Sequence, residues 1–403
     1  MTANERLRRI ATLNPADNSL MSPTALIVGA GIGGLSAGIM LEQAGWTVRI
    51  FERAATPREL GFGLALAPNA IVALTRIGVA ETVIARGFAP TRARFEIRRL
   101  DGCVLKHAEL QDVSALGGRF VIALRPALHG ALLEAAGDCV AAGHEATRFS
   151  ASGDKVTLEF ARQAPVEGDL LIGADGMGSA IRRQLHPSEP APRSSGLVAV
   201  RGAVHGAQYH LGGLAAIYYL GRGVESVIVR ASDTGIYWFA SLNRALVPDS
   251  LRDPAAVLAH ISPRFDGTFR AITGATDDLR FDELSDRDPL PHWGAGRVTL
   301  LGDAAHPLLP HTGQGAAQAM VDAVTLGTGL RDHTAIEPTL RAYEHERRGK
   351  TATLLGQGRR TAAMMRTMNP VATAARDIAI RLMPVKPIIR VLMTINRRAG
   401  TRV

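Results

Sequence analysis

Residues 24–53 read TALIVGAGIGGLSAGIMLEQAGWTVRIFER, and this stretch decides the fold. A short β-prone run ends at Val28, a helical pattern extends from about Gly33 to Gly45, and an alternating run then ends near Glu52. This order of strand, helix and strand predicts a βαβ unit whose two strands run parallel.

The glycines of this unit follow the spacing Gly29-x-Gly31-x-x-Gly34 at its first turn. We expect Gly29 to permit the tight turn, Gly31 to let the backbone approach a pyrophosphate, and Gly34 to let the helix pack on the strand. Unpaired N–H groups at the helix start would attract the phosphates. Glu52 stands where an acid accepts hydrogen bonds from an adenosine ribose. The unit therefore predicts dinucleotide binding, without distinguishing FAD from NAD.

A second glycine-containing stretch, DLLIGADGMGSAIRR, occupies residues 169–183. It predicts a strand, a sharp turn at Gly173–Gly176 and a helix that begins near Ser179. Asp175 follows the strand, and a carboxylate at the carboxyl end of a strand in an open α/β sheet is well placed to bind a ligand. The alternative is a turn aspartate that only satisfies local backbone groups.

A third stretch, RVTLLGDAAHPLLPHTGQGAAQAMVDA, occupies residues 297–323. It predicts a strand over 297–301, with Gly302 and Asp303 at its carboxyl end and a helix that begins around Gly315. A carboxylate accepts hydrogen bonds well from a polyhydroxyl chain.

Together, these three stretches resemble one family over about residues 24–343, the FAD-dependent aromatic-hydroxylase type (group A) of flavoprotein monooxygenase. The resemblance implies that NADH or NADPH reduces FAD and that dioxygen then forms a 4a-hydroperoxyflavin. This species would hydroxylate an electron-rich, aromatic or heteroaromatic small molecule, while the protein positions the substrate and excludes water.

The same resemblance implies roles for individual residues. Asp303 would hold a ribityl hydroxyl, Asp175 would lie near the pyrophosphate, and N–H groups at 313–315 would favour the anionic reduced flavin. Arg125 begins a helix, where its charge opposes the helix dipole, so we expect it to meet an anion. The nicotinamide cosubstrate would dock transiently near Arg125 or the second stretch. The predicted cofactor-binding residues are Gly29, Gly31, Gly33, Gly34, Glu52, Arg53, Arg125, Asp175, Gly302, Asp303, Gly313, Gln314, Gly315 and Ala316.

Residues 194–280 hold four β-prone runs separated by glycines and polar turns, which predicts an antiparallel sheet as the substrate-binding layer. Arg201 matches an active-site arginine of some relatives, or pairs with a surface acid. We expect His311 to transfer protons, His306 to pack, and Asn69 to cap a helix. The predicted catalytic residues are His311 and Arg201, with a substrate pocket of Arg201, Tyr218, Tyr237, Pro310 and His311 and no metal.

The predicted architecture is α/β, with a Rossmann-like FAD-binding domain whose mainly parallel sheet has helices on both faces. A β-rich substrate layer is interleaved with it, and a helical C-terminal segment follows. The expected boundaries are a flexible N-terminal tail (1–23), FAD-binding parts (24–93, 117–187 and 282–340), substrate-layer parts (94–116 and 188–281) and a basic helical C-terminal segment (341–403).

Charge and cysteine content restrict the setting. The net charge is +9, and from residue 341 onwards fourteen basic residues face three acidic ones. Cys103 and Cys139 cannot form a disulfide framework, which favours a reduced, cytoplasmic protein. We expect a monomer or homodimer. We expect a last helix over 388–395, no membrane-spanning segment, and a start at either Met1 or Met21.

Three other functions fit parts of the sequence. A flavoprotein of the same fold could act as an epoxidase, an oxidase or a double-bond reductase. An NAD-dependent dehydrogenase would use the first stretch alone. The basic tail could bind an anionic membrane or nucleic acid, although Tyr343 is its one aromatic residue, which argues against base stacking.

Overall fold

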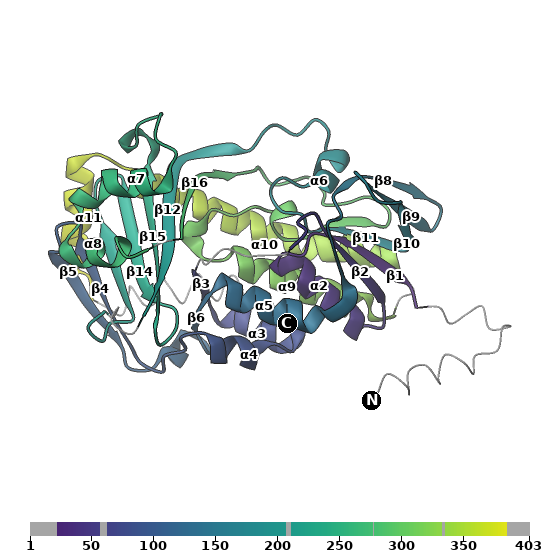
Figure 1. The fold of residues 1–403 in the computed structure, drawn as a ribbon, viewed down its shortest axis with the longest axis horizontal. Helices are drawn as coiled ribbons and strands as arrows, with labels where there is room; N and C mark the ends of the chain where they lie inside the picture. Colours follow the sequence, from purple (N-terminus) through teal and green to yellow (C-terminus); the bar gives the residue numbers. More distant parts are fainter. Residues whose placement is uncertain (1–21, 57–62, 207–210, 277, 333–334, 385–403) are drawn as a thin grey trace.

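The computed structural model describes residues 22–56, 63–206, 211–276, 278–332 and 335–384. The expectations about the N-terminal tail, the start site and a helix over 388–395 therefore lie outside the described residues. The described chain forms two halves side by side, one built on a five-stranded sheet and the other on a seven-stranded sheet (Figure 1).

The five-stranded sheet is parallel throughout, and the first βαβ unit lies at its centre. Helix α2 (Ile32–Gln43) follows its strand β1, as the sequence predicts. The strands lie in the order β17 (Val298–Leu300), β11 (Leu170–Gly173), β1 (Thr24–Val28), β2 (Thr47–Glu52) and β7 (Val140–Ala142).

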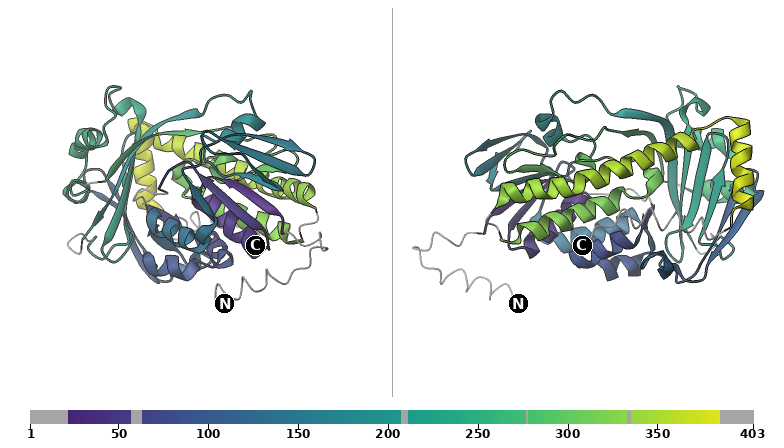
Figure 2. Two further views of the ribbon diagram at one scale, coloured as in Figure 1. Left: turned by 45° about the vertical axis from the view of Figure 1, so that its right-hand side comes forward. Right: turned by 180° about the vertical axis from the view of Figure 1, so that it is seen from behind.

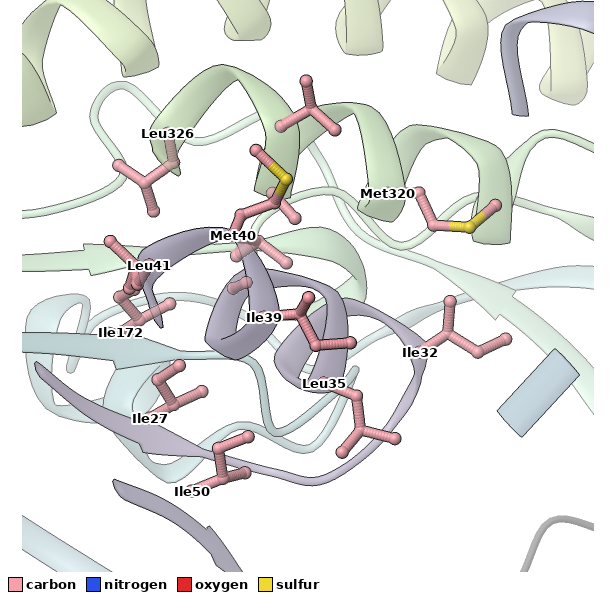
Figure 3. Close-up of a cluster of buried hydrophobic side chains, with 14 of the residues drawn as sticks. Ile27, Ile32, Leu35, Ile39, Met40, Leu41, Ile50, Ile172, Met320 and Leu326 are labelled. Atoms are coloured by element: carbon pink, nitrogen blue, oxygen red, sulfur yellow. The ribbon is translucent and has the colours of Figure 1, made fainter. Parts of the chain in front are cut away.

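Helices α2 and α9 (Gly315–Gly329) cover one face of this sheet (Figure 3). A Cβ on Gly38 would lie 2.6 Å from Cδ1 of Ile50, so α2 approaches the sheet closely. A Cβ on Gly327 would similarly lie 2.6 Å from the Cβ of Met40. The two helices and the sheet therefore share one apolar core, in which each buried side chain gains the usual transfer free energy.

The opposite face of the parallel sheet carries a three-stranded antiparallel sheet. The short helix α6 (Ala180–Leu185) packs beside it at the end of β11, so the expectation of helices on both faces holds only in part. A Cβ on Gly168 would lie 2.7 Å from Cγ of Leu26, and the rings of Phe51 and Phe160 lie 4.8 Å apart. Residues 146–168 alternate apolar and polar side chains and can bury one face only as strands. The strands are β8 (Ala146–Ser152), β9 (Lys155–Phe160) and β10 (Val166–Gly168).

The seven-stranded sheet contains the four β-prone runs of residues 194–280, which form strands as the sequence predicts. Its neighbours are antiparallel except for β13 and β4, which run parallel. The order is β16 (Leu279–Asp286), β12 (Arg193–His205), β15 (Gly235–Asn243), β14 (Val224–Arg230), β13 (Ala216–Leu220), β4 (Ala93–Arg99) and β5 (Val104–Leu110).

The two faces of the seven-stranded sheet have different coverings. Helices α7 (Pro254–Ile261) and α8 (Gly267–Thr273) pack on the outer face, where Trp238 lies against Phe269. The inner face shares a core cluster with Leu309 from the other half. Figure 1 shows this inner face turned toward the parallel-sheet half, so a ligand between the halves would contact it.

The remaining helices and strands complete the layers. Figure 2 shows the long helix α10 running from the parallel-sheet half to the seven-stranded sheet. Among the described residues, no helix combines the length and apolarity needed to cross a membrane. The further elements are β3 (Gly63–Leu66), β6 (Val121–Leu124), α3 (Pro68–Ile77), α4 (Ala80–Arg86), α5 (Arg125–Ala136), α6 (Ala180–Leu185), α10 (Ile336–Met365) and α11 (Pro370–Leu382). The predicted fold class, a parallel α/β domain interleaved with a β-rich layer, is confirmed.

Candidate active site

The three glycine-containing stretches meet at one edge of the parallel sheet. Their strands β17, β11 and β1 are adjacent and parallel, so their carboxyl ends lie together. A Cβ on Gly29 would lie 2.5 Å from the carbonyl oxygen of Ala174, and one on Gly33 would lie 2.7 Å from Cδ2 of Leu301. The first stretch therefore contacts the second and the third directly.

The glycines of the first turn serve different structural purposes. Gly29 has φ +101°, a conformation that favours glycine. A Cβ on Gly34 would lie 1.9 Å from the carbonyl oxygen of Gly29, so Gly34 packs against the turn itself. A Cβ on Gly31 would meet no atom within 4 Å. The backbone at Gly31 is thus open to a ligand, as its predicted approach to a pyrophosphate requires.

Glu52 lies beside this turn at the end of β2. Its Oε2 accepts a hydrogen bond from the N–H of Ala30 (3.0 Å), and its Oε1 accepts one from the N–H of Ala54 (2.9 Å). From α5, the Nε2 of buried His129 lies 2.8 Å from the carbonyl oxygen of Ala30. Arg125 begins the same helix and is half-buried. These contacts hold the turn in place before any ligand binds.

Asp175 follows β11 and turns toward the start of α6. Its Oδ2 accepts a hydrogen bond from the N–H of Ala180 at 2.7 Å. Its Oδ1 is buried and has no hydrogen-bond partner among the described residues. Burial raises the pKa of this carboxyl group, although hydrogen bonds from Ser179 and the backbone oppose that rise. An acceptor left in this way suits a ligand with donor groups.

Asp303 and the segment 313–315 lie at the end of β17 and the start of α9. Asp303 lies in the 3₁₀ turn Gly302–Ala304, and its side chain is exposed. Gly313 has φ +62°, and a Cβ there would meet no atom within 4 Å. For Gly315 the nearest atom would be Oδ1 of Asp303, at 4.0 Å. The helix start is therefore open, with its first N–H groups available.

A buried polar network supports the segment 313–315 from behind. The Nδ2 of Asn69 donates to Oε1 of Gln314 at 3.0 Å, and Nε2 of Gln318 donates to the same oxygen at 3.3 Å. Asn69 lies inside α3, whose N-cap is Ala67, so the expectation that Asn69 caps this helix is wrong. The Gln314 side chain therefore points inward, toward α3 and α9.

Asp322 is the centre of a second buried network. Its Oδ2 accepts a hydrogen bond from the N–H of Gly302 (3.1 Å) and lies 2.6 Å from Nε2 of His306. Arg347, on α10, donates from Nε to Oδ1 of Asp322. Burial alone would raise the pKa of Asp322, but the charges and hydrogen bonds of His306 and Arg347 lower it overall. The prediction that His306 packs is confirmed.

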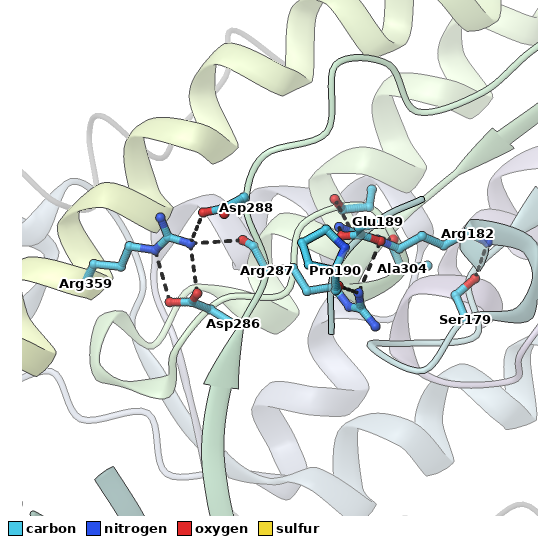
Figure 4. Close-up of polar contacts among 10 residues, drawn as sticks. Ser179, Arg182, Glu189, Pro190, Asp286, Arg287, Asp288, Ala304 and Arg359 are labelled. Carbon is cyan, nitrogen blue, oxygen red and sulfur yellow. Dashed lines mark hydrogen bonds and ion pairs between the residues drawn. The ribbon is translucent and has the colours of Figure 1, made fainter. Parts of the chain in front are cut away.

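Arg182 connects the second stretch to the third (Figure 4). Its side chain is 1% exposed, and it donates to the carbonyl oxygens of Ala304 (2.9 Å) and Ala305 (3.1 Å). Its backbone N–H donates to Oγ of Ser179. Glu189 balances its charge. The turn that carries Asp303 is thus held by a buried guanidinium.

The same figure shows how the two halves are joined by ion pairs on the connecting segments (Figure 4). Asp286, at the end of β16, is fully buried and pairs with Arg359 of α10 and Arg193 of β12, both at 2.8 Å. These two arginines lower the pKa of Asp286 against the effect of burial. Arg287 pairs with Glu189 at 3.2 Å.

Arg201 lies on the inner face of the seven-stranded sheet. Its guanidinium lies 2.7 Å from Oδ2 of Asp282 on β16, and both side chains are less than a fifth exposed. Its Cζ lies 5.7 Å from the ring centre of Phe239. The sequence left two roles open for Arg201, an active-site residue or the partner of an acid. The structure shows the pairing with an acid, Asp282, on the face that is turned toward the parallel-sheet half.

The other predicted pocket residues differ in exposure. Tyr218 on β13 is 41% exposed, whereas Tyr237 on β15 is buried and burial raises its pKa to about 12. A Cβ on Gly63 would lie 2.3 Å from the Tyr237 ring, so β3 covers this tyrosine. Pro310 is exposed at the start of the 3₁₀ turn Pro310–Thr312.

His311 reaches from that turn to the seven-stranded sheet. Its side chain is 1% exposed, and its Nε2 lies 3.2 Å from Oε1 of Glu225 and 3.3 Å from Oγ of Ser241. Its Nδ1 is buried and has no hydrogen-bond partner in the described part of the chain. Burial lowers the pKa of His311 to about 4 and raises the pKa of Glu225 to about 7.

Sequence reasoning missed several residues of this site. Glu225 carries a visible signal, because it is the one acid within the β-prone run ESVIVRA. Asp282 and the Asp322–Arg347 pair carry none, since their importance comes from residues far away in the chain.

The polar groups at the carboxyl ends of strands β1, β11 and β17 fit FAD. Open backbone at Gly31, Gly313 and Gly315, the Asp175 oxygen without a partner, and exposed Asp303 suit a ligand with phosphates and a polyhydroxyl chain.

Comparison with known proteins agrees with this geometry. The family model described as an FAD binding domain matches residues 22–356. The chain is similar to 6-hydroxynicotinate 3-monooxygenase of Bordetella bronchiseptica, with 32% identity over 81% of this chain and 88% of the relative. Aurachin C monooxygenase/isomerase of Stigmatella aurantiaca is 30% identical over 89% of this chain and 94% of the relative.

A solved structure is similar over nearly the whole chain. Klebsiella pneumoniae HpxO, in complex with FAD and uric acid, superposes with a TM-score of 0.85 and 27% identity, over 93% of this chain and 97% of that one. The chain therefore belongs to the family of FAD-dependent monooxygenases of the aromatic-hydroxylase type, as the three glycine-containing stretches predict.

Proposed function

We propose that this enzyme hydroxylates a small aromatic or heteroaromatic molecule that carries a hydroxyl or amino group, with dioxygen and NADH or NADPH as cosubstrates. The observation that carries the proposal is the inner face of the seven-stranded sheet. It sets the aromatic side chain of Phe239 and the Arg201–Asp282 pair opposite the segment 310–315 that leads into α9. Relatives named for hydroxynicotinate and urate support an electron-rich heteroaromatic ring.

FAD, when bound, supplies the electron transfer and oxygen activation that no side chain of this chain provides. We assign the ribityl hydroxyls to Asp303, the adenosine ribose to Glu52, and the pyrophosphate region to the turn at Gly29–Gly34 and to Asp175. Arg53 and Arg125 add positive charge for phosphates. Gly313, Gly315 and Ala316 offer backbone N–H groups at the start of α9.

We assign substrate recognition to the inner face. An anionic substrate group would share the Arg201 guanidinium with Asp282, since a guanidinium has five donors. The Phe239 ring would stack on an aromatic substrate, with Tyr218, Tyr237 and Pro310 at its margins. We place His311 in proton transfer, because a neutral imidazole with a free ring nitrogen can accept a proton.

We also place the protein in the cytoplasm, as a monomer or homodimer. Both cysteines are free thiols, and Cys103 is exposed, which suits a reducing compartment.

The test is a screen of hydroxylated and aminated aromatic compounds with purified, FAD-loaded protein. We expect a substrate to stimulate NAD(P)H consumption and to gain one oxygen atom from ¹⁸O₂. Arg201→Gln should raise KM for anionic substrates more than for neutral ones, because it removes a positive charge. Product without ¹⁸O would instead support a reductase or oxidase of the same fold. A protein that oxidises an alcohol with NAD and no flavin would support a dehydrogenase.

A further inference from the structure

One side chain bridges the two halves at the candidate active site. His311 belongs to the turn Pro310–Thr312, directly before the open segment 313–315. Its Nε2 contacts Glu225 and Ser241, which are paired neighbours on strands β14 and β15. The two strands therefore present a carboxyl group and a hydroxyl group to one ring nitrogen.

Among the described residues, the other contacts of the turn are local or apolar. The N–H of Gly313 donates to the carbonyl oxygen of Pro310 at 2.9 Å. Within it, Oγ1 of Thr312 donates to the carbonyl oxygen of Leu309 at 3.5 Å, a long hydrogen bond that is local to the turn. Leu309 packs in the inner-face cluster, and a Cβ on Gly358 of α10 would lie 3.6 Å from Cγ2 of Thr312. These apolar contacts are not directional, whereas the hydrogen bond between Ser241 and His311 is directional and the carboxyl group of Glu225 lies 3.2 Å from the same ring nitrogen.

We propose that Glu225 is a positioning residue of the active site, which acts through His311 to hold the turn 310–312, and with it the FAD-binding segment 313–315, against the substrate sheet. The role of Glu225 in catalysis rests on the proposed function. The contact itself rests on the geometry of three side chains.

The proton state of Glu225 decides the form of this contact. When protonated, its carboxyl group can donate to Nε2, and the imidazole proton then lies on Nδ1. When ionised, the carboxylate accepts from Nε2–H, and Nδ1 becomes an acceptor. Ionisation also places a charge in a site where Glu225 is 18% exposed and His311 is 1% exposed. Burying a charge costs free energy, so the ionised form favours a more open turn. Because the pKa of Glu225 is raised to about 7, both forms exist near neutral pH.

Few other charged or titratable side chains in the described part of the chain face Glu225 and His311. On β13, Tyr218 lies on the same face as Glu225, whereas Tyr219 lies on the other face and donates to Asp266. On β12 and β16 the charged groups on this face are the Arg201–Asp282 ion pair. The ring of Phe239 contacts both Arg201 and His311. On α10 the neighbouring Arg359 is paired with Asp286 and Asp288. Burial shifts the pKa of Glu225 upward and the pKa of His311 downward. The neighbouring charges are therefore not the cause of either shift.

The experiment measures FAD binding to the full-length apoprotein by flavin fluorescence between pH 5.5 and 8.5, without substrate. Wild-type protein should bind FAD about 3- to 10-fold more weakly above pH 7 than below it, the range expected for one hydrogen bond. Glu225→Gln keeps a donor and an acceptor but cannot ionise, so its affinity should match the low-pH wild type at every pH. Glu225→Ala should bind about 3- to 10-fold more weakly at every pH. Glu283→Gln on β16, a half-exposed glutamate, is the matched control and should retain the wild-type pH dependence.

The outcomes separate this proposal from the proposed function. A Glu225→Gln variant with the same pH dependence as wild type would overturn the role of Glu225. Loss of FAD affinity in Glu225→Ala that Gln does not rescue would show a packing role only and would also overturn it. A wild type that binds FAD with this pH dependence, yet hydroxylates no aromatic compound, would overturn the proposed function alone.

Discussion

Arg347 and Asp322 face each other with no exposed surface on either side chain, and Nε of the arginine lies 2.5 Å from Oδ1 of the aspartate. They come from α10 and α9, 25 residues apart. Through the other carboxylate oxygen, the pair also holds the N–H of Gly302 and the ring of His306. Both carboxylate oxygens of Asp322 therefore have partners, and these contacts fix the turn that carries Asp303.

Breaking this pair should therefore affect both stability and cofactor binding. We expect Arg347→Met or Asp322→Leu to lower the free energy of unfolding by about 3–5 kcal/mol, because each leaves a buried charge without its partner. The double variant should be less destabilised than the sum of the two single variants. Urea denaturation monitored by circular dichroism measures these values. Lys350→Met, on the exposed side of α10, is the control, and an equal loss there would contradict the assignment.

The first glycine turn gives a prediction that separates folding from ligand binding. Gly29→Ala should fail to fold normally, because its Cβ would lie 2.5 Å from a backbone oxygen and φ is +101°. Gly31→Ala should fold with wild-type stability, since its Cβ would meet no protein atom within 4 Å. It should nevertheless bind FAD at least about 10-fold more weakly, because the methyl group occupies the approach of the pyrophosphate. Thermal melting of the apoprotein and FAD titration measure the two effects. Equal FAD affinity in Gly31→Ala and wild type would exclude this position from the cofactor site.

Local patterns were sufficient to predict the parallel sheet, the four strands of residues 194–280 and the positions of the three glycine-containing stretches. Their signal lies in periodicity and in fixed spacings of a few residues. The antiparallel sheet of 146–168 was missed because an amphipathic strand does not reveal which face of another sheet it will cover.

The polar networks of the site could not be predicted in the same way. Asparagine is common at helix N-caps, yet the side chain of Asn69 donates a hydrogen bond to Gln314, 245 residues later. Glu225 and His311 are 86 positions apart and meet only because the turn Pro310–Thr312 packs against the seven-stranded sheet. A side chain's charge can be read from sequence, but its partner and its burial are products of tertiary structure.

Asp303 provides the most direct test of the cofactor assignment. We expect Asp303→Ala to lose most bound FAD, because it removes the acceptor for the ribityl hydroxyls. Its fold should be retained, since the Asp303 side chain is exposed at the end of β17. Flavin content after purification, measured by absorbance, and far-ultraviolet circular dichroism give the two readouts. Asp332→Ala removes an exposed aspartate beyond α9 and should leave flavin content unchanged. Normal flavin retention and turnover in Asp303→Ala would reject the assignment.

His311 and Glu225 should act on stability in opposite directions as pH changes. The folded pKa of His311, about 4, lies below its ordinary value of 6.5, so the unfolded chain binds a proton first and stability falls as pH drops from 6.5 to 4. The folded pKa of Glu225, about 7, lies above its ordinary 4.5, so stability falls as pH rises from 4.5 to 7. Each shift corresponds to at most about 3.5 kcal/mol, at roughly 1.4 kcal/mol per pKa unit.

Between pH 4.5 and 6.5 the two contributions largely cancel in the wild type, so single variants should expose them. Relative to wild type, His311→Asn should gain stability as pH falls through this window, whereas Glu225→Gln should gain stability as pH rises. His345→Asn, an exposed histidine on α10, should follow the wild-type curve. Thermal unfolding of the apoprotein at half-unit pH steps measures the differences. Curves for the two variants that run parallel to wild type would mean that neither group titrates abnormally in the folded protein, because an abnormal folded pKa requires stability to change with pH.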